Sequence, residues 1–365
     1  MTIADLAKHR LINHGIAGSE FEKPQEVVQW LGAMQAQEFA MAKWAIALRA
    51  RGVDDVVIEN AFNRGDILRT HLLRPTWHFV SPDDIRWLLM LTAPRVHAVN
   101  AYWYRKFELD AGTLKRSRAV FEKALAGKHF LTRDILNEKL AEKKIHADGL
   151  RLAYLFMHAE LEGLICSGPR QGKQFTYAWL DERVPETKTI AREEALARLA
   201  NRYFTSRSPA TVHDLSYWSG LTLKDAQAAA NLLPATFENE NVNGVEYIEK
   251  PGSSKISATS QTTFLMPDYD EYGMSYKNRE ALVDPKRQHK PAVDTPGSNH
   301  MLVVNGVISG TWQRKQKSPG GIEVMPFYTF SKQQTQAVAK AVKEYLAFAM
   351  PNDKAEAPRK KVRAK

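Results

Sequence analysis

The order of helical and extended segments repeats along the chain. Residues 5–62 are patterned as four helices, and residues 67–80 (ILRTHLLRPTWHFV) as two strands around a tight turn at Arg74-Pro75. Helices and a hairpin in this order predict a winged helix. The same order recurs in helices at 117–126, 132–142 and 148–162 before a hairpin at 164–180. It recurs again in helices near 187–204, 211–218 and 222–233 before strand-like residues 236–248.

We therefore predict an α+β, mainly helical protein made of three tandem winged-helix domains with β-hairpin wings and a strand-rich C-terminal part. A period of roughly 90 to 110 residues is too long for a solenoid and fits tandem small domains. The predicted domains are 1–112, 113–185 and 186–350, and residues 351–365 are expected to form a basic disordered tail.

The strand-rich part carries the clearest local signal. Residues 301–312 alternate around Asn305-Gly306, and Asn-Gly is the strongest short-range indication of a hairpin. A further strand is predicted at 323–330 and a closing amphipathic helix at 332–349.

The charge of the chain favours a polyanionic partner. Its 51 Lys and Arg residues outnumber 41 Asp and Glu residues, which gives a net charge of +10. The basic tail accounts for part of this excess, and the body remains positive without it. Neutralised phosphates release counterions and so give sequence-independent affinity for nucleic acid. Many proteins are mildly basic without such a partner, so charge alone leaves both interpretations open.

Several classes of protein are excluded. The longest apolar stretch, 87–94, is far shorter than the about 18 residues of a membrane span, and the N-terminus lacks the apolar core of a secretory signal. A single cysteine, Cys166, excludes an internal disulfide and a thiolate metal cluster. Neither a phosphate loop nor a GxGxxG motif is present. We expect a cytoplasmic, nucleoid-associated protein without a membrane anchor, nucleotide or other cofactor.

Gln35-Ala36-Gln37 is the first candidate for chemistry. Residues two apart on a helix point in nearly opposite directions, whereas in an extended segment they face the same way. One apolar stripe ends at Met34 and the next starts at Met41, which predicts a connector between two helices. There the two amide groups could hold a water molecule or a base edge. Surface glutamines are common, so the spacing alone also allows a pair without function.

The first hairpin carries His71 and His78, with Arg69, Arg74 and Trp77 nearby. A zinc site normally has three or four protein ligands, so these two histidines predict no metal site. A basic and aromatic wing could contact phosphates and sugars through His71, Arg74, Trp77 and His78. Equally, alternating hairpin residues could simply face solvent and core.

Two further segments allow more than one interpretation. Trp312 is followed by Gln313, Arg314 and Lys315, which suit a DNA groove or a widened base step, although a core tryptophan at a strand end is an equal alternative. The acidic run DYDEY at 268–272 could supply paired carboxylates for acid–base catalysis. Its close spacing favours a solvated loop or a helix N-terminus.

Four segments together match one family in order and spacing: LGAMQAQEFAMAKWAIALRAR (31–51), ILRTHLLRPTWHFVSPDDIRWLL (67–89), FLMPDYDEYGMSYKNR (264–279) and MLVVNGVISGTWQRK (301–315). The chain resembles the AlkZ-like winged-helix DNA glycosylases over roughly residues 5–350. The resemblance implies three tandem winged helices around a positively charged channel. It also implies excision of alkylated purines, chiefly N7-alkylguanine, and in some members the unhooking of interstrand crosslinks.

The family's catalytic Gln-x-Gln element falls on Gln35 and Gln37. N7 alkylation makes guanine a good leaving group, so the enzyme mainly needs a positioned water and negative dipoles facing the sugar. The expected protein is a monomeric, monofunctional glycosylase of damaged double-stranded DNA, in which these glutamines position water for attack at C1′. The DNA contacts would include Trp312, Arg314 and Lys315. The alternative is a non-catalytic winged-helix DNA-binding protein or transcription regulator, whose duplex binding would be insensitive to Gln35→Ala.

Overall fold

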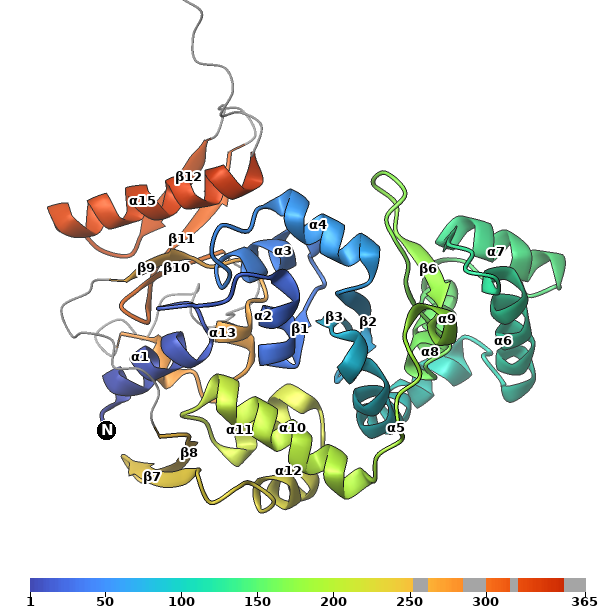
Figure 1. The fold of residues 1–365 in the computed structure, drawn as a ribbon, viewed down its shortest axis with the longest axis horizontal. Coiled ribbons are helices and arrows are strands. Elements are labelled where there is room, and N and C mark those ends of the chain that lie inside the picture. Colours follow the sequence, from blue (N-terminus) through green and yellow to red (C-terminus); the bar gives the residue numbers. More distant parts are fainter. Residues whose placement is uncertain (252–261, 285–299, 316–320, 351–365) are drawn as a thin grey trace, which may run out of the picture.

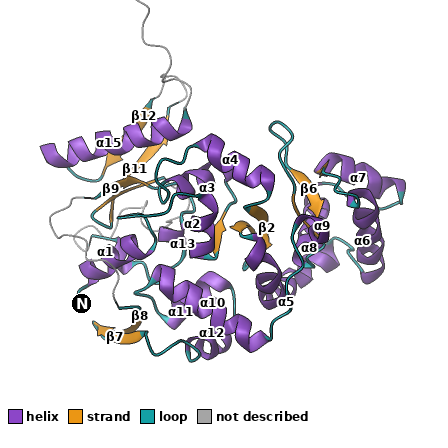
Figure 2. Ribbon diagram, in the orientation of Figure 1, coloured by secondary structure: helices purple, strands orange, loops and turns teal. Residues whose placement is uncertain are grey.

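The computed structural model describes residues 1–251, 262–284, 300–315 and 321–350, and it is an α+β structure with small antiparallel sheets (Figures 1 and 2). The tail expected at 351–365 lies outside these residues. No helix in the described ranges combines the length and the apolar character needed to cross a bilayer.

The first repeat follows α1 (Ile3–Asn13) and contains a three-stranded sheet in the order β1-β3-β2. Asp54 caps its third helix, and the hairpin turns at the predicted position. The predicted hairpin of two strands is confirmed, and the short strand β1, which the sequence did not predict, adds to it by pairing with β3. The elements are α2 (Pro24–Leu31), β1 (Ala33–Gln35), α3 (Phe39–Ala47), α4 (Asp55–Arg64), β2 (Leu68–Leu72) and β3 (Thr76–Val80).

A 25-residue helix, α5 (Pro82–Lys106), leads into the second repeat. This repeat has the same element order and the same strand order, β4-β6-β5. Thr132 caps its second helix by accepting a hydrogen bond from the Ile135 N–H. The elements are α6 (Ala111–Leu125), β4 (Leu131–Thr132), α7 (Arg133–Glu142), α8 (Gly149–Leu161), β5 (Ile165–Ser167) and β6 (Thr176–Trp179), followed by α9 (Leu180–Arg183).

The third repeat keeps this order in reduced form. Ala210 bridges Ile248, so one residue takes the place of the short first strand. Thr211 and Thr222 cap two of the helices, whereas the first helix begins at Arg192, five residues later than expected. The elements are α10 (Arg192–Arg207), α11 (Val212–Ser219), α12 (Leu223–Ala230), β7 (Glu238–Val242) and β8 (Val245–Glu249).

The C-terminal part forms a four-stranded antiparallel sheet in the order β12-β11-β10-β9, covered by a long helix. The hairpin at Asn305-Gly306 is confirmed, with φ of 52° and 84° at the two turn residues. The elements are β9 (Thr263–Leu265), α13 (Glu271–Met274), the 3₁₀ helix η1 (Glu280–Leu282), β10 (Met301–Val304), β11 (Val307–Arg314), β12 (Ile322–Pro326) and α15 (Lys332–Ala349).

This C-terminal sheet shares a hydrophobic core with the first repeat. Trp44 of α3 packs against Tyr345 and Phe348 of α15, and its indole donates to the Leu265 carbonyl over 2.7 Å. The first and last parts of the chain therefore close around one apolar cluster.

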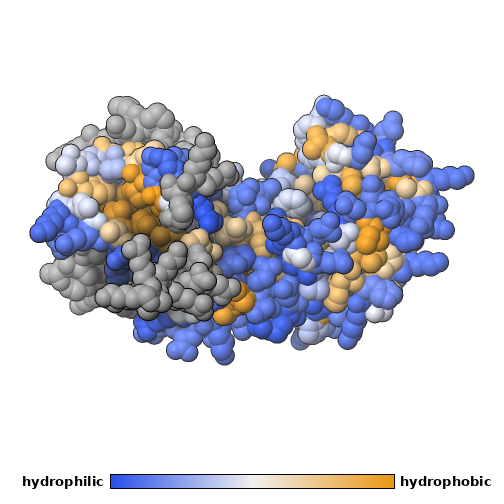
Figure 3. All heavy atoms as spheres, turned by 90° about the horizontal axis from the view of Figure 1, so that it is seen from above, coloured by the Kyte–Doolittle hydropathy of each residue, from blue (hydrophilic) through white to orange (hydrophobic). Residues whose placement is uncertain are grey.

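The second repeat lies at the opposite end of the molecule from α15 (Figure 1). Its α8 packs against α5 and β2, which joins it to the first repeat. Viewed from above, the end of the molecule formed by the second repeat is covered mostly by hydrophilic residues, with hydrophobic residues scattered between them (Figure 3).

Candidate active site

The Gln35-Ala36-Gln37 segment lies between α2 and α3, as predicted. Gln35 is the last residue of β1 and pairs with His78 of β3, and the Ala36 N–H donates to the Trp77 carbonyl over 2.7 Å. Met34 and Ala36 belong to the core cluster under the sheet, so strand alternation turns Gln35 to the opposite side, and Gln37 follows in a bend just beyond β1. Gln35 is buried, whereas Gln37 is exposed.

Two charged residues hold the backbone of this segment. The Glu271 carboxylate accepts the Gln35 N–H over 2.8 Å. Arg69 donates from Nε to the Ala36 carbonyl over 2.9 Å and from Nη2 to the Gln37 carbonyl over 3.4 Å. Burial lowers the pKa of Arg69 to about 10, so its guanidinium remains charged at neutral pH. The segment is thus fixed at both ends by side chains from other elements.

Glu271 is part of a buried network that the sequence did not reveal. Its Oε2 accepts from Arg207, Trp218 and Ser275 over 2.8, 2.8 and 2.9 Å. Burial alone would raise the pKa of Glu271, but the Arg207 charge and the hydrogen bonds outweigh burial and lower it to about 2. This carboxylate is therefore ionised and structural.

The neighbouring Asp270 is equally enclosed. It pairs with both terminal nitrogens of Arg49 over 2.7 and 2.8 Å and caps α13. A helix N-terminus was predicted here and is confirmed, while a solvated loop is wrong, because two buried arginines neutralise the acids. Arg207 stands between two serines in the sequence, so no local pattern indicated that it would be buried against Glu271.

Three polar side chains form a row across the three-stranded sheet β1-β3-β2 of the first repeat, here called the central sheet. His78 of β3 is the middle residue, and its cross-strand partners are Gln35 of β1 and Thr70 of β2. Gln35 Oε1, His78 Nε2 and Thr70 Oγ1 are buried and have no hydrogen-bond partner within the described part of the chain. Buried polar atoms are normally paired, so this row is suited to bind a water molecule or a polar ligand.

The hydrogen bonding of His78 determines which of its ring nitrogens can accept a hydrogen bond from a ligand. Its Nδ1 lies 2.9 Å from the Thr76 carbonyl, which can only accept, so Nδ1 carries the proton of the neutral ring. Burial, reinforced by the Arg74 charge, lowers the pKa of His78 to about 4. Nε2 is therefore an acceptor at neutral pH, on the residue that pairs with Gln35 across β1 and β3.

Comparison with known proteins identifies the family. The model of the DNA glycosylase AlkZ-like family matches residues 28–348, which include the whole central sheet. The chain belongs to the AlkZ-like DNA glycosylases. The resemblance stated from the sequence is confirmed.

A curated protein and a solved structure, both from Streptomyces sahachiroi, are similar to this AlkZ-like chain. One is an interstrand DNA cross-link repair glycosylase, 22% identical over 333 residues that cover 86% of this chain and 88% of the relative. The solved structure of the DNA glycosylase AlkZ superposes with a TM-score of 0.80 at 18% identity, covering 96% of this chain and 97% of that one. This structural similarity shows that the two share a fold.

The first hairpin of this AlkZ-like chain is not an exposed wing, because every residue of β2 is buried. His78 is fully buried, and His71 is buried in a pair with Glu160 of α8. Arg74 and Trp77 are half-buried. Arg74 lies over the Tyr217 ring at 5.4 Å, and Trp77 packs against His71 and Arg69. The expectation of surface contacts from both histidines is corrected, since packing against the other repeats covers this sheet.

The other residues predicted to contact DNA, Trp312, Arg314 and Lys315, also differ in burial. Trp312 is only 2% exposed, donates its indole N–H to the Met266 carbonyl over 2.9 Å, and packs against Tyr345. The core alternative therefore holds for Trp312. Arg314 and Lys315 are exposed, and Lys315 pairs with Glu323 across the hairpin.

Proposed function

We propose that this AlkZ-like protein is a monofunctional DNA glycosylase that excises N7-alkylguanine and similar cationic alkylpurines from double-stranded DNA. The observation that supports this most directly is the pair of buried acceptors, Gln35 Oε1 and His78 Nε2, beside the exposed Gln37. Membership of a glycosylase family supports the reaction class.

The proposed step is hydrolysis of the N-glycosidic bond. The bond between C1′ and the purine breaks, and its electron pair neutralises the cationic base, so no acid is needed. A water molecule donates its two hydrogens to Gln35 Oε1 and His78 Nε2, which leaves a lone pair free for C1′. As the new bond forms, one water proton passes to His78 and then to solvent. Neutral groups of this kind limit attack on undamaged bases, because they cannot protonate them.

We propose a different role in the reaction for Gln37. It is exposed in the bend just beyond the end of β1, two residues after Gln35. Its amide oxygen would place negative dipole density near the oxocarbenium-like sugar. An exposed group also suits a crosslinked guanine, which cannot be fully extruded from the duplex. The name of the cross-link repair relative supports interstrand crosslinks as a second substrate class.

The three repeats are proposed to be winged helices that place this sheet against DNA. All three share one order of helices and strands. The net charge of +10 and the exposed Arg314 and Lys315 would contribute phosphate contacts. We propose that the protein acts as a monomer.

The decisive experiment is base release from an N7-methylguanine duplex, comparing the wild type with Gln35→Ala/Gln37→Ala. We expect release without strand nicking in the wild type and a loss of at least about 100-fold in the variant. Gln333→Ala removes an exposed glutamine of α15 and serves as the control. A wild type that releases nothing from either a methylated or a crosslinked duplex, while still binding DNA, would instead support the regulator alternative.

A further inference from the structure

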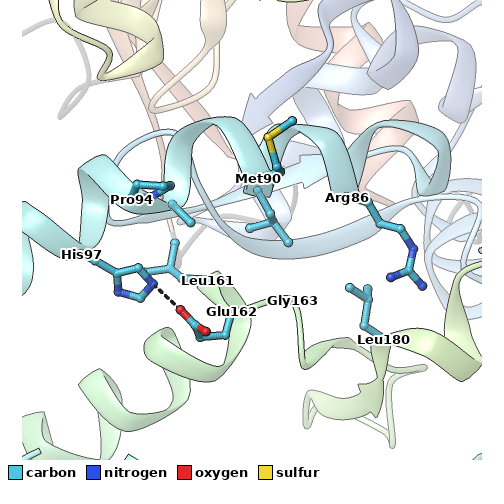
Figure 4. Close-up of a pocket in the computed structure, with 10 residues that line it drawn as sticks. Arg86, Met90, Pro94, His97, Leu161, Glu162, Gly163 and Leu180 are labelled. Carbon is cyan, nitrogen blue, oxygen red and sulfur yellow. Dashed lines mark ion pairs between the residues drawn. The ribbon is translucent and has the colours of Figure 1, made fainter. Parts of the chain in front are cut away.

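A second group of chemistry-bearing side chains lies where α5 meets α8. His97 of α5 and Glu162, which follows α8, point toward one another at the edge of a cavity of about 350 Å³ (Figure 4). His158 lies one helical turn before Glu162, so both side chains leave α8 on the same face. The remaining lining is largely apolar and includes Met90, Pro94, Leu161 and Leu180.

The three side chains are close enough to share one ion. One potential ligand atom from each of His97, His158 and Glu162 lies within 4.8 Å of the others. The two imidazole rings are 4.9 Å apart. His97 Nε2 lies 3.0 Å from Glu162 Oε1, the distance of an ion pair (Figure 4), so an imidazole nitrogen and a carboxylate oxygen already face one another.

We propose that His97, His158 and Glu162 bind one Zn²⁺ ion, with a fourth coordination position open to the cavity. Two imidazoles and one carboxylate are a recurrent zinc ligand set, completed by water. Hard ions such as Mg²⁺ and Ca²⁺ prefer sites built from oxygen ligands, so this donor set selects against them.

A hydrogen bond from outside the cluster orients one of the proposed ligands. His97 Nδ1 lies 2.8 Å from the Tyr104 hydroxyl, which fixes the ring and leaves Nε2 for the ion. A contact of this kind on the second ring nitrogen is the usual arrangement for a histidine that binds a metal.

Such an ion would fasten the second repeat to the rest of the molecule. Ala93 and Val96 of α5 already pack against Met157 and Leu161 of α8 in a small apolar cluster. The same helix α8 carries Glu160, which pairs with His71 of the central sheet. Zinc would thus brace the helix that supports the first hairpin, without taking part in the proposed hydrolysis.

The first test is Zn²⁺ titration of tag-free, EDTA-treated protein by calorimetry. We expect one equivalent to bind with a Kd below about 10 µM, and substitution by Co²⁺ to produce visible d–d absorption. Mg²⁺ at the same concentration should give no binding heat. A wild type that binds no Zn²⁺, or binds it only at several weak sites, overturns the proposal.

Matched variants locate the site. His158→Ala and Glu162→Gln should each weaken Zn²⁺ binding by at least about tenfold. His146→Ala, which removes an exposed histidine shortly before α8, should leave it unchanged. Glu162 is exposed, so Glu162→Gln is expected to fold, and circular dichroism verifies this for each variant. Unaltered affinity and stoichiometry in folded Glu162→Gln and His158→Ala would refute the assignment, whatever the outcome of the base-release assay.

Discussion

The Gln35 N–H donates to the Glu271 carboxylate over 2.8 Å, although 236 residues separate them in sequence. The carboxylate is in turn held by Arg207 at the end of α10. The end of β1 is therefore positioned by the third repeat and the C-terminal part together, and the geometry of the Gln-x-Gln segment depends on parts of the chain far from it.

Glu271→Gln should destabilise the protein strongly. The substitution leaves the fully buried Arg207 without its counterion, so the free energy of unfolding should fall by about 3–5 kcal/mol. Urea unfolding at pH 7 measures this. Asp181→Asn, which breaks an exposed pair with Arg86, is the control and should cost less than about 1 kcal/mol. Equal losses in the two variants would contradict the structural role of Glu271.

Acid should weaken the fold through His78. The folded-state pKa of His78, about 4, is below its usual 6.5, so its contribution to stability is present above pH 6.5 and is lost as pH falls toward 4. Between pH 7 and pH 5 the wild type should lose about 2 kcal/mol more unfolding free energy than His78→Gln. Parallel pH profiles for the two proteins would show that His78 is not buried in its neutral form.

Arg69→Met should slow base release without weakening DNA binding, because Arg69 holds the backbone of the Gln-x-Gln segment. The change removes the donors to the Ala36 and Gln37 carbonyls but keeps an apolar stem beside Trp77. We expect base release to fall about tenfold while the Kd for duplex DNA stays within twofold. Arg64→Met, at an exposed arginine, should change neither quantity. A proportional loss of binding would instead make Arg69 a DNA contact.

Trp312 and Arg314 should have different effects, although they lie two residues apart. Trp312→Ala removes a core side chain and should cost about 3–5 kcal/mol of unfolding free energy. Arg314→Ala should leave the free energy of unfolding unchanged. It should reduce the slope of log K against log salt concentration for DNA binding by about 1, the amount expected for one lost phosphate contact. Salt titrations of binding and urea unfolding together test both. An unaltered salt slope in Arg314→Ala would remove this hairpin from the DNA surface.

Local chemistry made much of the fold predictable. Asp54, Thr132 and Thr211 cap helices through contacts within four residues, and Asn305-Gly306 forms its turn by itself. The three-residue strand β1 could not be predicted in the same way, because it exists only where β3 offers a pairing edge.

The candidate sites were predictable only where they depend on residues close together in sequence. The Gln-x-Gln spacing identified a connector, but the partners of Gln35 come from distant packing. Glu271 and His78 acquire their environments only when helices of the third repeat cover the sheet. His97 and His158 are 61 positions apart, and only the contact between α5 and α8 brings them together.

The apolar cluster that joins Trp44 to Phe348 has a consequence for synthesis on the ribosome. The first repeat emerges before α15, which completes its core. Until α15 follows, the nascent chain exposes the apolar face of α3, and Gln35 lacks its carboxylate partner until Glu271 has emerged. A product stalled before Glu271 would thus carry the two glutamines of the proposed site without the carboxylate that positions the Gln35 backbone.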